Sequence, residues 1–227
     1  MTKKAKIRSK ALKDKKILIT AGPTWVPIDD VRVISNTATG ETGLLLAEEA
    51  RSRGANVRVL LGPALERIGS WHKNTESFRY FGELQEKLSR ELLRHKYDVV
   101  IHSAAVSDYQ LRRAYRKKIP SGKKDFSLEL APTPKIVDSI KRQDPELMLV
   151  AFKFETQAGQ RELRREAEIL SKRCQAEIVV ANTIRNNLYE AFIVRKGGIC
   201  GPFGSKKTLA KNLMRCIEEK LASDEKR

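Results

Sequence analysis

The chain has 227 residues, of which 41% are hydrophobic, and a formal net charge of +17. Its apolar residues occur in short blocks, none close to the roughly 20 residues that a helix needs to cross a bilayer, and no apolar signal-peptide core follows the basic N-terminus. We therefore expect a cytoplasmic α/β protein with one core.

The net charge favours nucleic acid as a partner at first sight, but its distribution weakens that interpretation. Residues 1–16 hold eight Lys or Arg and one Asp, a net +7, and we expect residues 1–15 to be a disordered basic tail before a single domain at 16–227. A nucleic-acid-binding α/β module remains the alternative function, although the chain lacks the interleaved aromatic residues of a single-strand groove. Salt-sensitive RNA retention without enzyme activity would favour it.

The cysteines and histidines indicate no structural metal centre. The cysteines are widely spaced, form no C-x-x-C pair and are expected to be reduced thiols. The histidines have no spacing that suits zinc together with them. The residues concerned are Cys174, Cys200, Cys216, His72, His95 and His102. The sequence identifies no metal ligands.

The first predicted elements enclose two turns that contain glycine. Residues 16–20 form a predicted strand that ends in the turn Ala21-Gly22-Pro23-Thr24, where glycine allows close backbone approach. The second turn, at 37–43, opens directly into a helix predicted at 44–53. Its backbone N–H groups should point outward from the helix N-terminus and form an anion cradle. A second strand is predicted at 56–62.

Helices and strands continue to alternate toward the C-terminus. Helices are predicted at 83–95, 133–142, 159–174 and 206–222, and strands at 98–105, 126–130, 147–154, 177–181 and 192–195. Between them, the basic residues 110–124 are expected to form a mobile loop or flap. The alternation predicts a three-layer, Rossmann-like α/β fold, with a mostly parallel sheet and helices on both faces.

Ligands of such sheets bind outside the carboxyl ends of the strands, where several loops converge. The chain has no Walker A motif, no G-x-G-x-x-G after the first strand and no G-x-S-x-G elbow. This argues against a common NTPase, a hydrolase and, as a third class of function, an NAD-linked reductase. The polar residues at the strand ends suit phosphates and a carboxyl group without identifying a reaction: Thr24, Asn36, Thr39, Asp108, Lys118 and Asn182.

Taken together, the segments from about Lys15 to the C-terminus resemble one family, the phosphopantothenate-cysteine ligases of coenzyme A synthesis. Each matching stretch is short, but their order and spacing make the combination specific. The stretches are 16–24, 27–29, 34–36, 102–109, 118–119, 152–156 and 178–182.

The resemblance implies a two-step ligation that uses CTP or ATP as co-substrate, with Mg²⁺. The carboxylate of 4′-phosphopantothenate attacks the α-phosphate, pyrophosphate leaves, and an acyl-nucleotidylate remains. The amine of cysteine then attacks the acyl carbon, giving phosphopantothenoylcysteine and a nucleoside monophosphate. Fixed N–H donors, a cation and Mg²⁺ would stabilise the negative charge that develops.

By the same resemblance, Lys118 and Asn36 are the catalytic candidates. Lys118 matches the family's flap lysine, which acts when the acyl-nucleotidylate is converted to product. The Asn36 amide suits the acyl and amide groups of the intermediate. Asn182, together with Asn36, is expected to bind substrate. The residues expected to bind the nucleotide are Gly22, Thr24, Thr39, Gly40, Ala104, Ala105, Asp108 and Phe152.

This chain departs from the family's pattern at two places near the expected nucleotide. Lys153 follows Phe152 where many bacterial relatives have small residues, which leaves both CTP and ATP open. The loop at 37–43 lacks the lysine of a Ser-Ser-Gly-Lys-Met-Gly type loop. Only a short basic tail occupies residues 1–15, so we expect a stand-alone ligase without a flavin-dependent decarboxylase domain. We also expect a homodimer, paired through the strands near 182–195.

Overall fold

The computed structural model describes residues 12–63, 74–122 and 124–224. Most of the predicted basic tail, up to residue 11, lies outside the described residues, as does Lys123 of the basic loop. Leu12 belongs to the fold, because its side chain is fully buried in the core and its N–H donates to the carbonyl oxygen of Arg53. The folded domain therefore includes residues before the boundary predicted at 16.

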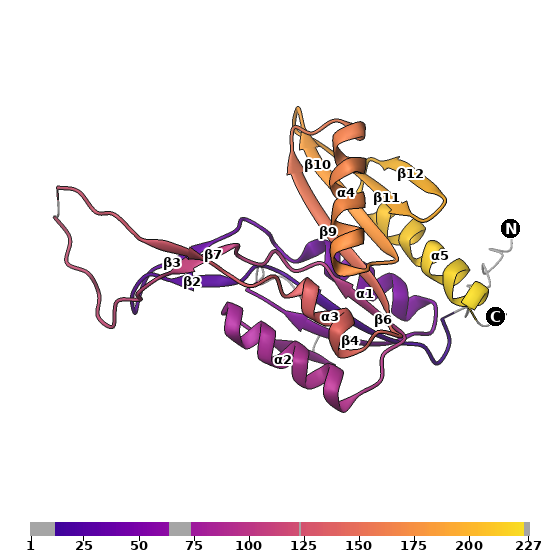
Figure 1. Ribbon diagram of the computed structural model, residues 1–227, viewed down its shortest axis with the longest axis horizontal. Helices are drawn as coiled ribbons and strands as arrows, with labels where there is room; N and C mark the ends of the chain where they lie inside the picture. The colour runs from indigo at the N-terminus through magenta and orange to yellow at the C-terminus, as the bar shows by residue number, and fades with distance from the viewer. Residues whose placement is uncertain (1–11, 64–73, 123, 225–227) are drawn as a thin grey trace, which may run out of the picture.

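An eight-stranded sheet forms the centre of the molecule, in the order β12-β11-β10-β9-β6-β1-β4-β5 (Figure 1). β11 (Leu188–Arg195) and β12 (Gly198–Phe203) are antiparallel additions at one edge. The other strands are parallel and, because helices cover both of their faces, consist largely of buried aliphatic residues. They are β1 (Lys16–Ala21), β4 (Asn56–Leu61), β5 (Thr75–Ser77), β6 (Val99–His102), β9 (Met148–Thr156) and β10 (Ile178–Arg185).

Helices lie on both faces of the sheet and divide the core into two. One core joins α1 and α5 to side chains such as Ile19 and Ile101, and the other joins α2, α3 and α4 to Leu18 and Val100. Successive residues of a strand point to opposite faces, which explains this division. The predicted three-layer α/β fold with a mostly parallel sheet is confirmed. The helices are α1 (Glu41–Ser52), α2 (Phe81–Arg94), α3 (Val137–Gln143), α4 (Gln160–Cys174) and α5 (Lys206–Asp224).

Two antiparallel ribbons project from the body of the molecule (Figure 1). In one, β2 (Trp25–Pro27) pairs with β3 (Val33–Ser35); in the other, β7 (Tyr109–Leu111) pairs with β8 (Leu130–Pro132). We call residues 25–36 and 109–132, which include the predicted flap, the arm. The arm contains many of the large hydrophobic residues that are exposed: Val31, Val33, Ile34, Tyr109, Tyr115, Phe126 and Leu130.

The predicted strand at 126–130 is wrong, because residues 126–129 are irregular and Leu130 begins a short strand that pairs with β7 rather than with the central sheet. The strands β2, β3, β5, β7 and β12 were not predicted. For the predicted elements, the remaining differences lie at boundaries. α1 begins at residue 41 instead of 44, β6 ends at residue 102 instead of 105, and β10 continues to residue 185. Among the described residues, no helix is both long enough and apolar enough to span a membrane.

Candidate active site

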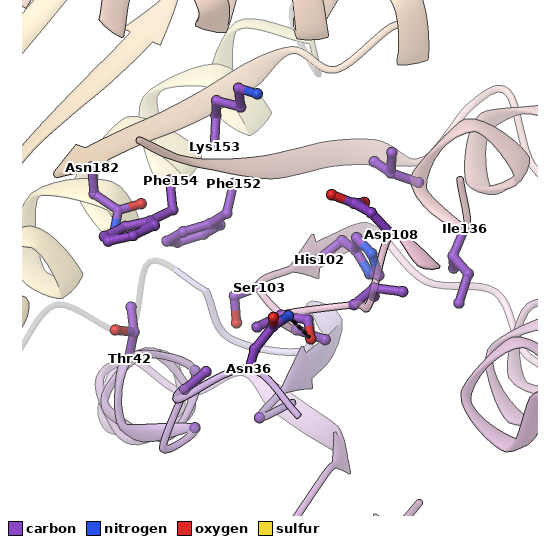
Figure 2. A pocket seen from close by; sticks show the side chains of 18 of the residues that line it. Asn36, Thr42, His102, Ser103, Asp108, Ile136, Phe152, Lys153, Phe154 and Asn182 are labelled. Atoms are coloured by element: carbon purple, nitrogen blue, oxygen red, sulfur yellow. Dashed lines mark hydrogen bonds between the residues drawn. The ribbon is translucent and has the colours of Figure 1, made fainter. Parts of the chain in front are cut away.

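A pocket of about 680 Å³ opens at the carboxyl ends of β1, β6, β9 and β10, beside the N-terminus of α1 (Figure 2). Both faces of the sheet contribute to its lining. Phe152 packs against the core that contains α1 and α5, whereas Ile136 and Leu170 belong to the core that contains α2, α3 and α4. The pocket therefore straddles the end of the sheet, where open α/β folds bind their ligands.

The loop at 37–43 lines the pocket and leads into α1. Gly40 caps the helix with a φ of 78°, a left-handed conformation that glycine adopts without steric cost. At Gly43, a Cβ atom would lie 2.4 Å from the Cβ of Ala21 and 2.8 Å from the Oγ of Ser103, so its absence lets α1 start directly against β1 and β6. The first-turn N–H groups of α1 lack partners within the helix, and they supply donors for the predicted anion cradle.

Thr20 and His102 are neighbours in the parallel register at the ends of β1 and β6. The Thr20 hydroxyl accepts from the N–H of Ala104 at 3.3 Å and lies 2.8 Å from Nδ1 of His102. Its own hydrogen can then donate to Nδ1, which places the proton of a neutral imidazole on Nε2. Burial lowers the pKa of His102 to about 4. His102 therefore lines the pocket as a neutral side chain near pH 7.

Asn36 and Asp108 are each held by a neighbouring loop. Nδ2 of Asn36 donates to the carbonyl oxygen of Ala105 at 3.0 Å. The amide has a second N–H and an acceptor oxygen, so it can bind a ligand while it keeps this bond. Oδ1 of Asp108 lies 2.5 Å from Nζ of Lys135, but both side chains are well exposed, at 64% and 44%. Water screens such an exposed pair, so Asp108 can exchange Lys135 for a ligand at little cost.

Phe152 and Phe154 point to the same side of β9, toward Asn182 of β10 (Figure 2). Asn182 is the register partner of Phe154 in this parallel pair. Lys153 points to the opposite face of the strand, where its Nζ lies 2.8 Å from Oε1 of Glu155 and 3.8 Å from Oε2 of Glu166. Lys153 also lines the pocket, but its charge lies on the face of β9 opposite the two rings.

The structure brings most of the predicted site residues together at this pocket. Thr24 does not line it, because its side chain is buried; its hydroxyl accepts from the N–H of Ser107 and its carbonyl oxygen from the Ser107 hydroxyl. Thr24 connects the segments that follow β1 and β6, and its contact with the nucleotide stays a prediction. The predicted residues that line the pocket are Gly22, Asn36, Thr39, Gly40, Ala104, Ala105, Asp108, Phe152 and Asn182.

Lys118 lies on the arm, where it is exposed and outside the lining of the pocket. The next residue is anchored: the N–H of Ile119 donates to Oδ2 of Asp29 at 3.0 Å, and its carbonyl oxygen accepts from Arg32 at 2.8 Å. Hydrogen bonds from the Arg32 side chain, and then from the Ile119 N–H, hold the pKa of Asp29 well below its usual range. The predicted flap is therefore bonded, immediately beside Lys118, to the turn between β2 and β3.

Sequence reasoning named no role for several polar residues of the pocket, among them His102, Tyr189 and Lys206. His102 falls in the matching stretch 102–109, and its position at a strand end is the same signal that points to Asp108. Lys206 reaches the pocket from α5 and Tyr189 from β11, and no local pattern indicates either. The Tyr189 hydroxyl is buried and finds no hydrogen-bond partner among the described residues. In the same part of the chain, no group of three His, Cys, Asp or Glu side chains could hold a metal ion.

Comparison with known proteins identifies the family. The model of the DNA/pantothenate metabolism flavoprotein C-terminal domain matches residues 12–221. The chain belongs to this family. A relative from Thermococcus kodakarensis, the Coenzyme A biosynthesis bifunctional protein CoaBC, is 39% identical over 79% of this chain and 44% of its own length.

The chain is also similar to a protein with a different name and to a solved structure. A relative from an unknown prokaryotic organism, named a cysteine/cysteine sulfinic acid decarboxylase, is 35% identical over 81% of this chain and 50% of its own length. A crystal structure of the C-terminal domain of a CoaBC protein has a TM-score of 0.77 and 27% identity, and covers 95% of this chain and all of the other. The chain spans about half the length of the curated relatives it matches.

Proposed function

We propose that this chain ligates 4′-phosphopantothenate to cysteine, with a nucleoside triphosphate as co-substrate. The observation that carries the proposal is the pocket at the carboxyl ends of the strands, where an anion cradle, an anchored amide, a carboxylate and an aromatic side come together in a member of this family. The name CoaBC of the relative from Thermococcus kodakarensis points to the same pathway, coenzyme A biosynthesis.

The reaction requires two transfers at one centre. The phosphopantothenate carboxylate attacks the α-phosphorus, and the bond to the β-phosphate oxygen breaks to release pyrophosphate. The cysteine amine then attacks the acyl carbon of the acyl-nucleotidylate, loses a proton and displaces the nucleoside monophosphate. Negative charge develops on phosphate oxygens in the first step and on the acyl oxygen in the second, so both steps benefit from fixed donors.

The pocket offers a separate group for each part of these substrates. The N-terminus of α1, with Thr39 and Gly40, would bind phosphates, and the ring of Phe152 would lie beside the nucleotide base. Asp108 would accept hydrogen bonds from ribose or help to position Mg²⁺. Asn36, held by the carbonyl of Ala105, would bind the acyl group of the intermediate, and Asn182 would contact substrate.

The proposed Mg²⁺ would bind in this pocket together with the nucleotide and not at a site made by the protein alone. Its lining includes the carboxylates Glu41, Asp108 and Glu166, which come from different elements. Mg²⁺ usually keeps several waters and is held by one or two carboxylates together with substrate phosphates. The cation would neutralise charge on the triphosphate, and the residues of the chain would orient it.

Lys118 is the proposed donor for the amide-forming step, yet it lies outside the pocket lining. It must therefore reach the acyl-nucleotidylate by movement of the arm, or from the arm of a second copy. We propose a homodimer, which light scattering tests directly. If the protein is a monomer at assay concentration, Lys118 must reach the acyl-nucleotidylate by movement of the chain's own arm.

The deciding experiment combines the protein and Mg²⁺ with phosphopantothenate and cysteine, and compares CTP with ATP. Pyrophosphate and the mass of phosphopantothenoylcysteine are measured together. We expect both to appear only when all substrates are present, with one nucleotide preferred. Folded protein that forms no product with either nucleotide would contradict the proposal, and salt-sensitive retention of RNA by that protein would favour the nucleic-acid-binding alternative.

A further inference from the structure

The loop expected to face the nucleotide phosphates carries no cation of its own. Glu41 is the only charged residue between residues 37 and 43, and a carboxylate at this point repels an anion. The helix N-terminus supplies partial positive charge, equivalent to about half an elementary charge, which is small beside a triphosphate. Positive side chains from elsewhere in the fold must balance this charge. Lys135, Lys153, Arg173 and Lys206 line the pocket, and Lys206 contacts Glu41 of the loop itself.

Lys206, the first residue of α5, brings that charge to the loop. Its Nζ lies 2.5 Å from Oε2 of Glu41, and both residues line the pocket. The two side chains are 33% and 58% exposed, so the ion pair is screened by water and is weak. A phosphate oxygen that enters the pocket can therefore replace Glu41 as the partner of Lys206 at small cost.

The position of Lys206 is fixed by the packing of two helices that run in the same direction. At the pocket end Lys206 meets Glu41, and at the far end Arg53 lies 2.8 Å from Glu218. Side chains between these pairs, including Ala47 of α1 and Leu213 of α5, are buried in one core. Both helices consequently direct their N-termini toward the pocket, and the start of α5 is capped by the Ser205 hydroxyl, which accepts from the N–H of Thr208.

We propose that Lys206 binds the triphosphate of the nucleotide, exchanging its bond to Glu41 for a bond to a phosphate oxygen. The inference rests on the proposed function for the identity of the anion. Glu41 holds the ammonium group beside the helix N-terminus before the nucleotide arrives, and it weakens nucleotide binding because its own charge remains nearby. Lys206 thus supplies from α5 the positive charge that the loop lacks.

The test is calorimetric titration of the folded chain with CTP, ATP and inorganic tripolyphosphate, each with Mg²⁺, and with phosphopantothenate, together with the melting temperature of each variant. Loss of one charge-assisted hydrogen bond should make Lys206→Met bind the preferred nucleotide and tripolyphosphate about 10- to 100-fold more weakly. Lys206→Arg should restore most of the affinity. Glu41→Gln should bind about threefold more tightly, because a repulsive charge is removed. The matched control is Lys207→Met, which removes the neighbouring lysine, exposed and outside the pocket lining.

A purely structural role for Lys206 predicts a different result: a lower melting temperature with unchanged nucleotide affinity, or equal weakening for phosphopantothenate and nucleotide. Either outcome overturns the inference, as does equal affinity of Lys206→Met and the wild type. If the wild type forms product but its affinity does not depend on Lys206, only this inference fails. If tripolyphosphate binding depends on Lys206 but no product forms, the inference stands and the ligase proposal fails. If the wild type binds no nucleotide and no tripolyphosphate, both fail.

Discussion

The strands that carry the pocket and the arm beside them bury their side chains to very different extents. Ile19 and Ile101, near the carboxyl ends of β1 and β6, are fully buried, whereas Val31 and Tyr109 of the arm are 65% and 57% exposed. The pocket rests on two apolar cores, whereas within the arm the two ribbons are joined by polar bonds that include those to Asp29. Geometry at the pocket is set by packing, so it should resist single polar changes.

The largest expected effect belongs to the arm. Lys118→Gln should slow amide formation about 100- to 1000-fold, because one donor to a developing charge is lost, while the acyl-nucleotidylate still forms. Pyrophosphate release without cysteine measures the first step, and product mass measures the second. Lys117→Gln, an exposed neighbour, is the control. Unaltered turnover of Lys118→Gln would remove this lysine from the mechanism.

A smaller effect is expected where α1 meets the sheet. Gly43→Ala places a Cβ atom 2.4 Å from that of Ala21, and such overpacking should cost about 1–3 kcal/mol in the free energy of unfolding. Because the helix N-terminus must shift, nucleotide affinity should fall as well. Urea unfolding and calorimetric titration measure the two effects. Gly159→Ala, where a Cβ would meet no atom within 4 Å, should leave nucleotide affinity unchanged; equal losses in both variants would contradict this account.

The aromatic side of the pocket should show an effect on binding alone. Phe152→Ala should weaken nucleotide binding about tenfold through loss of ring contact with the base. The melting temperature should fall only modestly, because Phe152 is half-buried. Phe126→Ala on the arm serves as the comparison and should not alter nucleotide affinity. If both variants bind the nucleotide as the wild type does, the base lies elsewhere.

The smallest expected effect is a pH-dependent change in stability, and it again concerns a residue of the arm. The pKa of Asp29 is lowered in the folded chain, so its bonds stabilise the fold above the ordinary Asp pKa, and that stability is lost as pH falls toward the folded value. Asp29→Asn should therefore melt below the wild type at pH 7, and the difference should shrink below about pH 4. Asp30→Asn, exposed and adjacent, is the control. A difference that does not change with pH would show that the charge of Asp29 is not what anchors the arm.

The central sheet was predictable because its signals are local. Apolar blocks such as Val99-Val100-Ile101 can only be buried on both faces, and the alternation with amphipathic helices then implies parallel strands. The start of α1 was misplaced because Gly43 reads as part of a turn, whereas here it is needed inside the helix for close packing. Residues 126–129 read as a strand because nothing local shows that they lie outside the central sheet.

Some residues of the site could be predicted from nearby sequence, and others depend on contacts between distant segments. Asn36 and Asp108 were identified because they lie in short stretches that resemble the family and follow predicted strands. The burial of Thr24 and the pairing of Thr20 with His102 depend on contacts across 82 or more residues. The contact between Glu41 and Lys206 spans 165 residues and depends on how α5 packs against α1. Such contacts form only when the whole fold is assembled, so the sequence of a single segment cannot predict them.

The pocket that straddles the end of the sheet has a consequence for cooperativity. A molecule that fills it touches side chains from both apolar cores, Phe152 on one face and Ile136 on the other. Unfolding either layer would then release the same ligand. Occupancy should therefore couple the two layers thermodynamically, raising the melting temperature in proportion to the logarithm of ligand concentration and sharpening the transition into a single step.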